Sequence, residues 1–293
     1  MKKSRLLTTL LSIATFFGSF ASCKTFEPYE LTLTTFNIRT MASSDVGVKA
    51  WENRREAVVA FINDSGADII GLQEVTLTQF VYIYQKIASN YEALHFPRQS
   101  GGNPEGVAFV YDKTVFNLVS QEKYWLSETP DEMSKGWDET YYRVAAVLTL
   151  EHIQTGERIK AINTHGPLAA AANEKAFELI ASRSLSGKNE PFTVMMGDFN
   201  ATPNKLGYVP IAEKLQDCRV SAQESSNRDN ATFTNWGKET PGRIIDYCFV
   251  SKGENVQVLS YQVRDERWGD GNYISDHFAV QTTVRIEKSE RGV

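Results

Sequence analysis

The sequence is poor in the residues that form thiol-based metal sites and has no hydrophobic run long enough to span a bilayer comfortably. Its 293 residues include only three cysteines and four histidines, and no spacing typical of structural zinc occurs. Low-complexity segments and internal repeats are also absent. With 42% hydrophobic and 23% charged residues, the composition excludes a disordered chain, a collagen and a multispan membrane protein, and indicates a globular protein.

Positive charge is scarce as well. The 31 Lys and Arg residues are outnumbered by 36 Asp and Glu residues, which gives a formal net charge of −5. Because duplex binding depends on neutralising phosphates with Lys and Arg, this balance argues against a protein that wraps a long polyanion. A local basic pocket stays open. We expect no stable nucleic-acid partner, and we expect a monomer.

The N-terminal segment has the pattern of an export signal. Three basic residues among the first five precede the charge-free apolar run 6–20, which is shorter than the about 20 residues that span a bilayer. The run leads to Cys23 and resembles a bacterial lipoprotein signal, in which that cysteine becomes lipidated. The alternative is ordinary secretion with Cys23 as a bystander. We expect a signal peptide over 1–22, a tether over 23–30, and a lipoprotein anchored to a bacterial membrane on its periplasmic or cell-surface side.

The rest of the chain, 31–293, reads as one domain. Apolar runs predict strands at 31–38, 67–72, 106–111, 143–151, 158–163, 192–196, 243–250, 256–263 and 277–286. Helical spacing occurs at 51–63, 76–89, 170–185 and roughly 205–215. Because strands alternate with helices in places and follow one another directly elsewhere, we expect an α/β sandwich rather than a regularly alternating barrel.

The export pathway would permit a disulfide between Cys218 and Cys248, but the apolar setting of Cys248 favours a core residue.

Polar residues end several of these apolar strands. The positions are Asn37, Glu74, His165, Asp198 with Asn200, Asp246, and Asp276 with His277. Taken singly, most of them fit turn or helix-cap positions. In open α/β sheets, however, ligands bind where strands end and loops begin, so their shared placement predicts one pocket. Asp246 lies in an apolar run, where a buried carboxylate needs a partner.

Several carboxylates in one pocket would repel one another unless their pKa values rise or a cation compensates them. Oxygen ligands without thiolates select hard cations, Mg²⁺ first and Mn²⁺ or Ca²⁺ next. Because Mg²⁺ takes only one or two protein carboxylates and keeps several waters, it leaves room for a substrate phosphate. The remaining acids would then be free to orient groups and to move protons.

At this point the sequence resembles the endonuclease/exonuclease/phosphatase superfamily. The matching segments are 35–39 (Thr-Phe-Asn-Ile-Arg), 71–75 (Gly-Leu-Gln-Glu-Val), 163–165 (Asn-Thr-His), 196–200 (Met-Gly-Asp-Phe-Asn), 243–247 (Arg-Ile-Ile-Asp-Tyr) and 275–277 (Ser-Asp-His). They occur in the family's order from residue 31 to the last strand. The resemblance implies a four-layer α/β sandwich in which two packed mixed β-sheets are flanked by helices.

The resemblance also implies a role for each polar residue. Glu74 resembles the principal Mg²⁺ ligand, and Asn37 and Asp276 resemble the residues that complete that site. His277 resembles the catalytic histidine, and Asp246 the acid that orients it. An acid beside a histidine fixes its tautomer, which is the arrangement of a catalytic triad.

Four further residues complete this set, and one aromatic residue is added. Asp198 and Asn200 resemble the pair that positions the attacking water or the phosphate, and His165 resembles a second catalytic histidine at the scissile phosphate. Arg143 resembles a phosphate-contacting arginine of deoxyribonuclease-like members. Trp268 leads into the Asp276-His277 segment and is a candidate for stacking on the substrate, although tryptophans more often anchor loops or cores.

We therefore expect an exported Mg²⁺-dependent hydrolase of phosphoester bonds, in which the metal and a histidine assist attack of water on phosphorus. A phosphodiesterase is the first expectation. A phosphomonoesterase acting on a phosphorylated sugar or lipid headgroup is the alternative within this chemistry. A catalytically inactive, surface-binding lipoprotein is the alternative from another class.

Overall fold

The computed structural model describes residues 27–187 and 191–287. The predicted signal peptide and Cys23 lie outside the described residues. Within the described ranges, none of the helices combines the length and the hydrophobicity that crossing a bilayer requires.

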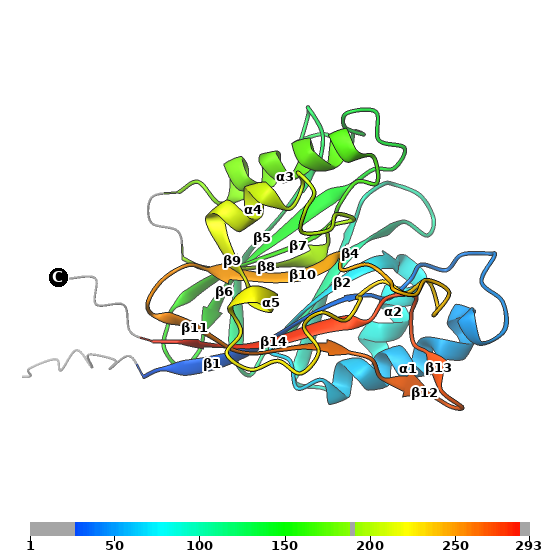
Figure 1. The fold of residues 1–293 in the computed structure, drawn as a ribbon, viewed down its shortest axis with the longest axis horizontal. Coiled ribbons are helices and arrows are strands. Elements are labelled where there is room, and N and C mark those ends of the chain that lie inside the picture. Colours follow the sequence, from blue (N-terminus) through cyan, green and yellow to red (C-terminus); the bar gives the residue numbers. More distant parts are fainter. Residues whose placement is uncertain (1–26, 188–190, 288–293) are drawn as a thin grey trace, which may run out of the picture.

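The first of two large sheets contains both ends of the described domain. Its six strands lie in the order β11 (Val256–Arg264), β14 (Ala279–Ile286), β1 (Tyr29–Asn37), β2 (Ile69–Thr76), β4 (Glu105–Asp112) and β3 (Tyr91–Pro97). The pair β1 and β2 is parallel, whereas the other pairs are antiparallel. Helices α1 (Trp51–Asp64) and α2 (Leu77–Lys86) cover its outer face (Figure 1).

The second sheet has the same size and its own pair of helices. Its strands lie in the order β5 (Phe116–Trp125), β6 (Val144–His152), β7 (Arg158–His165), β8 (Phe192–Asp198), β10 (Asp246–Ser251) and β9 (Leu215–Asp217). Helices α3 (Ala170–Ser184) and α4 (Val209–Lys214) pack on the outer face of this sheet. The smaller elements are η1 (Gly47–Lys49), α5 (Cys218–Ser221) and the hairpin of β12 (Arg267–Trp268) and β13 (Asn272–Tyr273).

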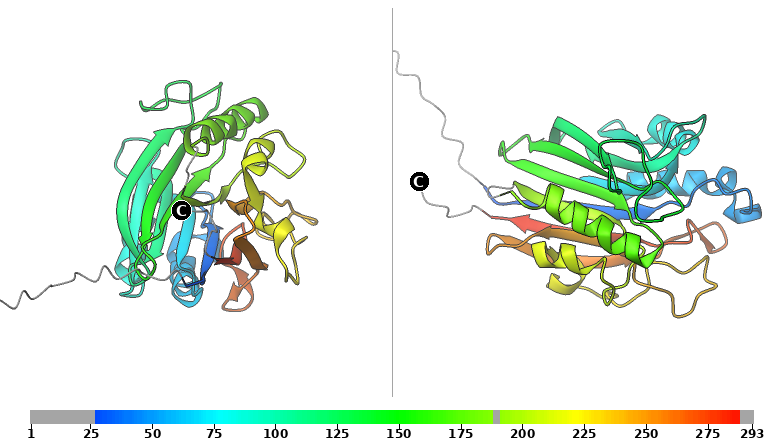
Figure 2. Two further views of the ribbon diagram at one scale, coloured as in Figure 1. Left: turned by 90° about the vertical axis from the view of Figure 1, so that its left-hand side faces the viewer. Right: turned by 90° about the horizontal axis from the view of Figure 1, so that it is seen from above.

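Three hydrophobic layers hold these parts together. One lies between the sheets, one under α1 and α2, and one under α3 and α4. The two further views in Figure 2 show the sheets stacked face to face. The expected four-layer sandwich of two mixed sheets with flanking helices is confirmed.

The sequence pattern misses five strands of the described chain: β3, β5 and the short strands β9, β12 and β13. In β5 the residues between its buried ends are mostly exposed, because this strand lies at the edge of its sheet. It therefore lacks the apolar run that marks a buried strand. Cys218 and Cys248 are both free and buried, which agrees with core positions and not with a disulfide.

Candidate active site

Strand alternation brings the polar strand ends to one place. In β1, Leu31 and Leu33 belong to the layer between the sheets, and Asn37, which is an even number of residues away, lies on the same face of the strand. In β8, Met196 belongs to the same layer, and Asp198 follows it by two residues. Because side chains two residues apart share a face of a strand, these polar groups lie at the end of the space between the two sheets.

Glu74 faces the same site because of a bulge in β2 and not because of regular alternation. Leu72 and Val75 both belong to the layer under α1 and α2, although residues three apart in a regular strand face opposite sides. A register shift against β4 lies between them, and Glu74 has a φ of 60°. This bulge changes the phase of the strand and turns the Glu74 carboxylate toward the site.

A buried amide from the opposite sheet supports the bulge. The amide nitrogen of Asn163 on β7 donates to the carbonyls of Leu72 (3.0 Å) and Ala108 (2.8 Å). Its amide oxygen accepts from the side chain of Gln73 at 2.8 Å. A Cβ atom at Gly71 would lie 3.0 Å from Asn163 and 2.5 Å from Met196, so glycine is required for this close approach of the sheets.

Asp198 is the centre of the site. Its Oδ2 atom accepts from the Asn37 amide at 3.0 Å and lies 3.4 Å from His165 Nε2 and 3.7 Å from His277 Nε2. Its Oδ1 atom accepts from the backbone N–H of Asn200 at 2.8 Å. Burial, and then repulsion from Asp246, raise the pKa of Asp198 to about 7.

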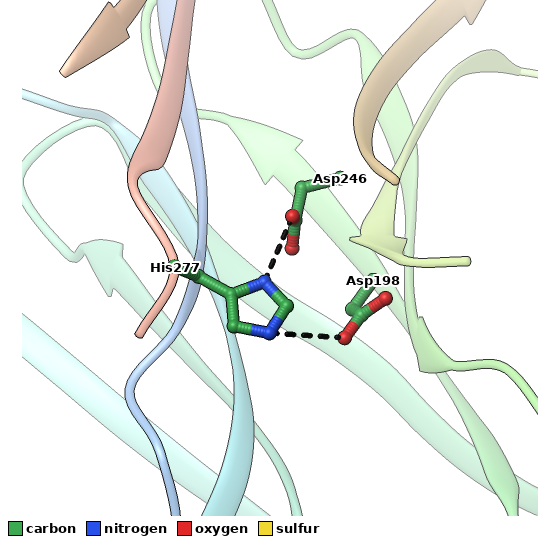
Figure 3. Close-up of side chains that lie close together, drawn as sticks. All are labelled: Asp198, Asp246 and His277. Atoms are coloured by element: carbon green, nitrogen blue, oxygen red, sulfur yellow. Dashed lines mark hydrogen bonds and ion pairs between the residues drawn. The ribbon is translucent and has the colours of Figure 1, made fainter. Parts of the chain in front are cut away.

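His277 lies between two carboxylates (Figure 3). Its Nδ1 atom is 2.9 Å from Asp246 Oδ2, and its Nε2 atom faces Asp198. Burial alone would lower the pKa of His277, but the charges of Asp246 and Asp198 outweigh it and raise the pKa to about 10. The buried Asp246 thus has the partner that its place in the sequence demands.

Oxygen donors gather beside this pair. Glu74 accepts from the Asn37 amide at 3.2 Å and from the backbone N–H of Thr40 at 2.9 Å. Burial would raise the pKa of Glu74, but this backbone N–H and the charges of His277 and Arg39 lower it. Burial and the charge of Glu74 raise the pKa of Asp276. A hard cation would relieve this crowding of carboxylates.

A second set of metal-ligand types consists of Asp198, Asp246 and His277, whose ligand atoms lie within 4.8 Å of one another. Both ring nitrogens of His277 already face carboxylates in this set. This arrangement fits an ion-paired proton donor better than a metal ligand.

Two arginines form a positively charged wall beside His165. The Arg143 guanidinium is buried, and its Nε and Nη1 atoms find no hydrogen-bond partner among the described residues. Arg98 pairs with Glu105 at 2.8 Å. Burial and the charges of Arg143 and Arg98 hold the pKa of His165 well below its ordinary value, so His165 is neutral at pH 7.

A cleft of about 430 Å³ exposes most of these groups. The expected residues that line it are Glu74, Arg143, His165, Asp198, Asn200, Asp276 and His277. Asn37 and Asp246 support it through their hydrogen bonds to Asp198, Glu74 and His277. Trp268 is not among the lining residues. It packs on the layer under α1 and α2, and its indole donates to the Tyr273 carbonyl.

Sequence reasoning missed other lining residues, among them Arg39, Arg98, Glu105, Tyr141 and Arg243. Arg39 and Arg243 occur inside segments that carry the family resemblance, which is a usable signal. Arg98 and Glu105 flank the loop between β3 and β4, and no pattern in the sequence relates them to the site.

The sequence model of the Endonuclease/Exonuclease/phosphatase family matches residues 34–277. The chain belongs to this family. Membership supports a phosphoesterase-type hydrolase, and members of the family generally depend on a divalent metal.

Solved structures agree with this assignment. A mannosyl-6-phosphatase from Bacteroides thetaiotaomicron is 26% identical, with a TM-score of 0.79 over 87% of this chain and 99% of that one. An endonuclease/exonuclease/phosphatase family protein from the same organism has a TM-score of 0.81 at 24% identity, over 90% of this chain and 97% of that one, and shows the shared fold.

Among curated proteins, the chain is similar to Ccr4 from Aspergillus clavatus, the 3'-5'-exoribonuclease subunit of the CCR4-Not complex. The two are 29% identical over 138 residues, which is 40% of this chain and 20% of that protein. The match therefore spans about a fifth of the length of this relative.

Proposed function

We propose that the chain is a Mg²⁺-dependent phosphoesterase in which Asp198 accepts a proton from the attacking water and His277 acts as a proton donor. One observation carries the proposal: a carboxylate that lies within 4 Å of two histidines lines the same cleft as the oxygen donors Glu74 and Asp276. Such a site supplies both a proton acceptor and groups that stabilise charge on a phosphoryl centre.

Glu74, Asn37 and Asp276 would hold the metal. Their donor atoms are oxygens, which suit Mg²⁺ and also Mn²⁺. Burial, and then the charge of Glu74, raise the pKa of Asp276, and a cation would relieve the repulsion between these two carboxylates. The bound ion supplies Lewis acidity toward a phosphoryl oxygen.

Two side chains of the protein would carry out the proton transfers, one as the acceptor and one as the donor. Asp198 has a pKa near 7, so its carboxylate can accept a proton from water at neutral pH. His277 is held protonated by Asp246 and Asp198, which makes it a donor to the developing oxyanion and to the leaving alkoxide. Asp246 fixes the ring orientation through Nδ1.

The charged wall favours a phosphomonoester as the substrate. A monoester dianion has one more negative charge than a diester, and Arg143 offers buried donors that have no partner among the described residues. Similarity to a mannosyl-6-phosphatase over nearly the whole of both chains supports a phosphorylated sugar. A phosphodiesterase is the second candidate, favoured by the similarity to an exoribonuclease subunit.

A substrate panel tests both candidates. Residues 24–293 would be assayed with mannose 6-phosphate, p-nitrophenyl phosphate, bis-(p-nitrophenyl) phosphate and an oligoadenylate, with Mg²⁺, with Mn²⁺ and after EDTA treatment. We expect faster release of phosphate from the monoesters and loss of activity in EDTA. Full activity after EDTA treatment would contradict the metal assignment, and faster cleavage of the diesters would favour the second candidate.

We also propose that the protein is exported and anchored through a lipidated Cys23 on the periplasmic or cell-surface side, and that it acts as a monomer. The basic start, the apolar run and the following cysteine support this proposal. Incorporation of labelled palmitate into the wild type but not into Cys23→Ser tests it, and equal labelling of both proteins would refute it.

A further inference from the structure

Two exposed apolar side chains lie at the cleft that contains the polar catalytic groups. Tyr141 is 46% exposed and Leu168 is 59% exposed, and both line the cleft with the catalytic groups. They come from separate connections, one before β6 and one after β7. Apolar groups held at the edge of a polar site typically contact the part of a ligand that does not react.

One buried carboxylate joins these two connections. Oε1 of Glu139 accepts from the backbone N–H groups of Thr140 (3.0 Å) and Tyr141 (3.3 Å). Its Oε2 atom accepts from those of Leu168 (2.8 Å) and Ala169 (3.1 Å). Glu139 is 6% exposed. A carboxylate that accepts four N–H groups fixes the backbones that carry both apolar side chains.

Other contacts hold the same two residues. The Tyr141 ring lies 5.3 Å from the Arg98 guanidinium and 5.6 Å from that of Arg143, so its position is tied to the charged wall. The loop before α3 is fixed by Asn173, whose amide donates to the Pro167 carbonyl at 2.8 Å. The Tyr141 ring and the backbone that carries Leu168 are therefore held in place despite the exposure of both side chains, and an apolar surface that is already positioned loses less entropy on binding.

We propose that Tyr141 and Leu168 form the leaving-group subsite and that its ligand is the ring of a monosaccharide phosphate. Glu139 is the positioning residue of this subsite. The inference rests on the proposed phosphoesterase function. A sugar ring offers apolar C–H faces to the tyrosine, and its hydroxyls face a cleft that also contains Asn200 and Asn235. The cleft volume of about 430 Å³ suits a single ring with its phosphate.

The experiment compares kcat/KM for mannose 6-phosphate, adenosine 5'-monophosphate and ethyl phosphate, which has no ring. We expect Tyr141→Ala and Leu168→Ser to lower kcat/KM for the sugar phosphate by about 10- to 100-fold, the range for lost apolar contacts. Ethyl phosphate should change less than about threefold in Leu168→Ser, and in Tyr141→Ala, whose ring also contacts Arg98 and Arg143, it should lose less than the sugar phosphate. Tyr141→Phe should keep the ring contact and behave as the wild type.

Glu139→Gln separates positioning from chemistry. In this variant one carboxylate oxygen becomes an amide nitrogen, which would face the backbone N–H groups of one connection, so the link between the two connections should loosen. We expect KM for mannose 6-phosphate to rise while kcat stays close to that of the wild type, and we expect ethyl phosphate to be hardly affected.

Matched controls are Tyr84→Ala and Leu206→Ser. These residues are 49% and 61% exposed, and neither lines the cleft. Equal losses with all three substrates, or none, would overturn the subsite while leaving the phosphoesterase function intact. A selective loss with the nucleotide alone would overturn the sugar assignment. Failure of the wild type to hydrolyse any of the three would overturn the phosphomonoesterase function and the subsite with it.

Discussion

Replacing Asn163 should damage both the stability and the site. Asn163→Ala removes the donors to the Leu72 and Ala108 carbonyls and the acceptor for Gln73. Each buried polar group that loses its partner costs about 1–3 kcal/mol, and the small cavity adds to this cost. Because Gln73 keeps its contacts with Thr35 and Gly71, we expect a total loss of about 2–5 kcal/mol in the free energy of unfolding.

The same change should loosen the bulge that turns Glu74 toward the site. A displacement of a catalytic group by about 1 Å can cost roughly 100-fold in rate, so we expect a loss of about 10- to 100-fold in kcat/KM and a higher Mg²⁺ requirement.

Urea unfolding measures the stability, and Mn²⁺ binding followed by water proton relaxation measures the metal site without turnover. Asn117→Ala, at an exposed position of β5, is the control and should change stability by less than about 0.5 kcal/mol. A loss below about 1 kcal/mol in Asn163→Ala, together with unchanged Mn²⁺ binding, would refute the reasoning.

Three further predictions concern the charged residues. His277→Ala should reduce kcat by about 10²- to 10⁴-fold in protein that is still folded by circular dichroism, and near-normal turnover would remove its role. Glu74→Gln should weaken Mn²⁺ binding at least tenfold in the relaxation measurement, and equal binding would exclude it as a ligand. Burial raises the pKa of Asp68 from 3.8 to about 6, so its contribution to stability is complete below pH 3.8 and is lost as the pH rises through about 6. Asp68→Asn should therefore gain about 1–3 kcal/mol relative to the wild type between pH 4 and pH 7, and a gap that does not change with pH would contradict this prediction.

Much of the site was predictable because strand periodicity is visible in the sequence. Asn37, Asp198 and His165 each end an apolar run in the phase of its inward-facing residues. The inward-facing residues of the two sheets pack against each other, so polar side chains that follow them at the strand ends meet at one end of the space between the sheets. The cost of burying an unpartnered carboxylate predicted that Asp246 has a partner, and the family resemblance implied that this partner is His277.

Other features depend on tertiary structure and leave no local signal. Strict alternation would turn Glu74 to the outer layer, and only the bulge in β2 corrects its direction. Glu139 accepts a hydrogen bond from the backbone of Leu168, nearly thirty residues away in the sequence, and no local pattern predicts this contact. Trp268 precedes the catalytic segment in sequence, but its hairpin packs on the layer under α1 and α2 instead of entering the cleft.

Strand β1 runs from the N-terminal end of the described chain to the catalytic cleft. The strand starts at Tyr29, which pairs with Ile286 near the end of the described chain, and its nine residues end at Asn37. That length corresponds to roughly 30 Å. In a protein tethered through its N-terminus, the catalytic opening would thus point outward from the bilayer. Phosphate esters arriving from the surrounding medium could reach it directly, whereas headgroups of the anchoring leaflet would lie beneath the opposite end of the molecule.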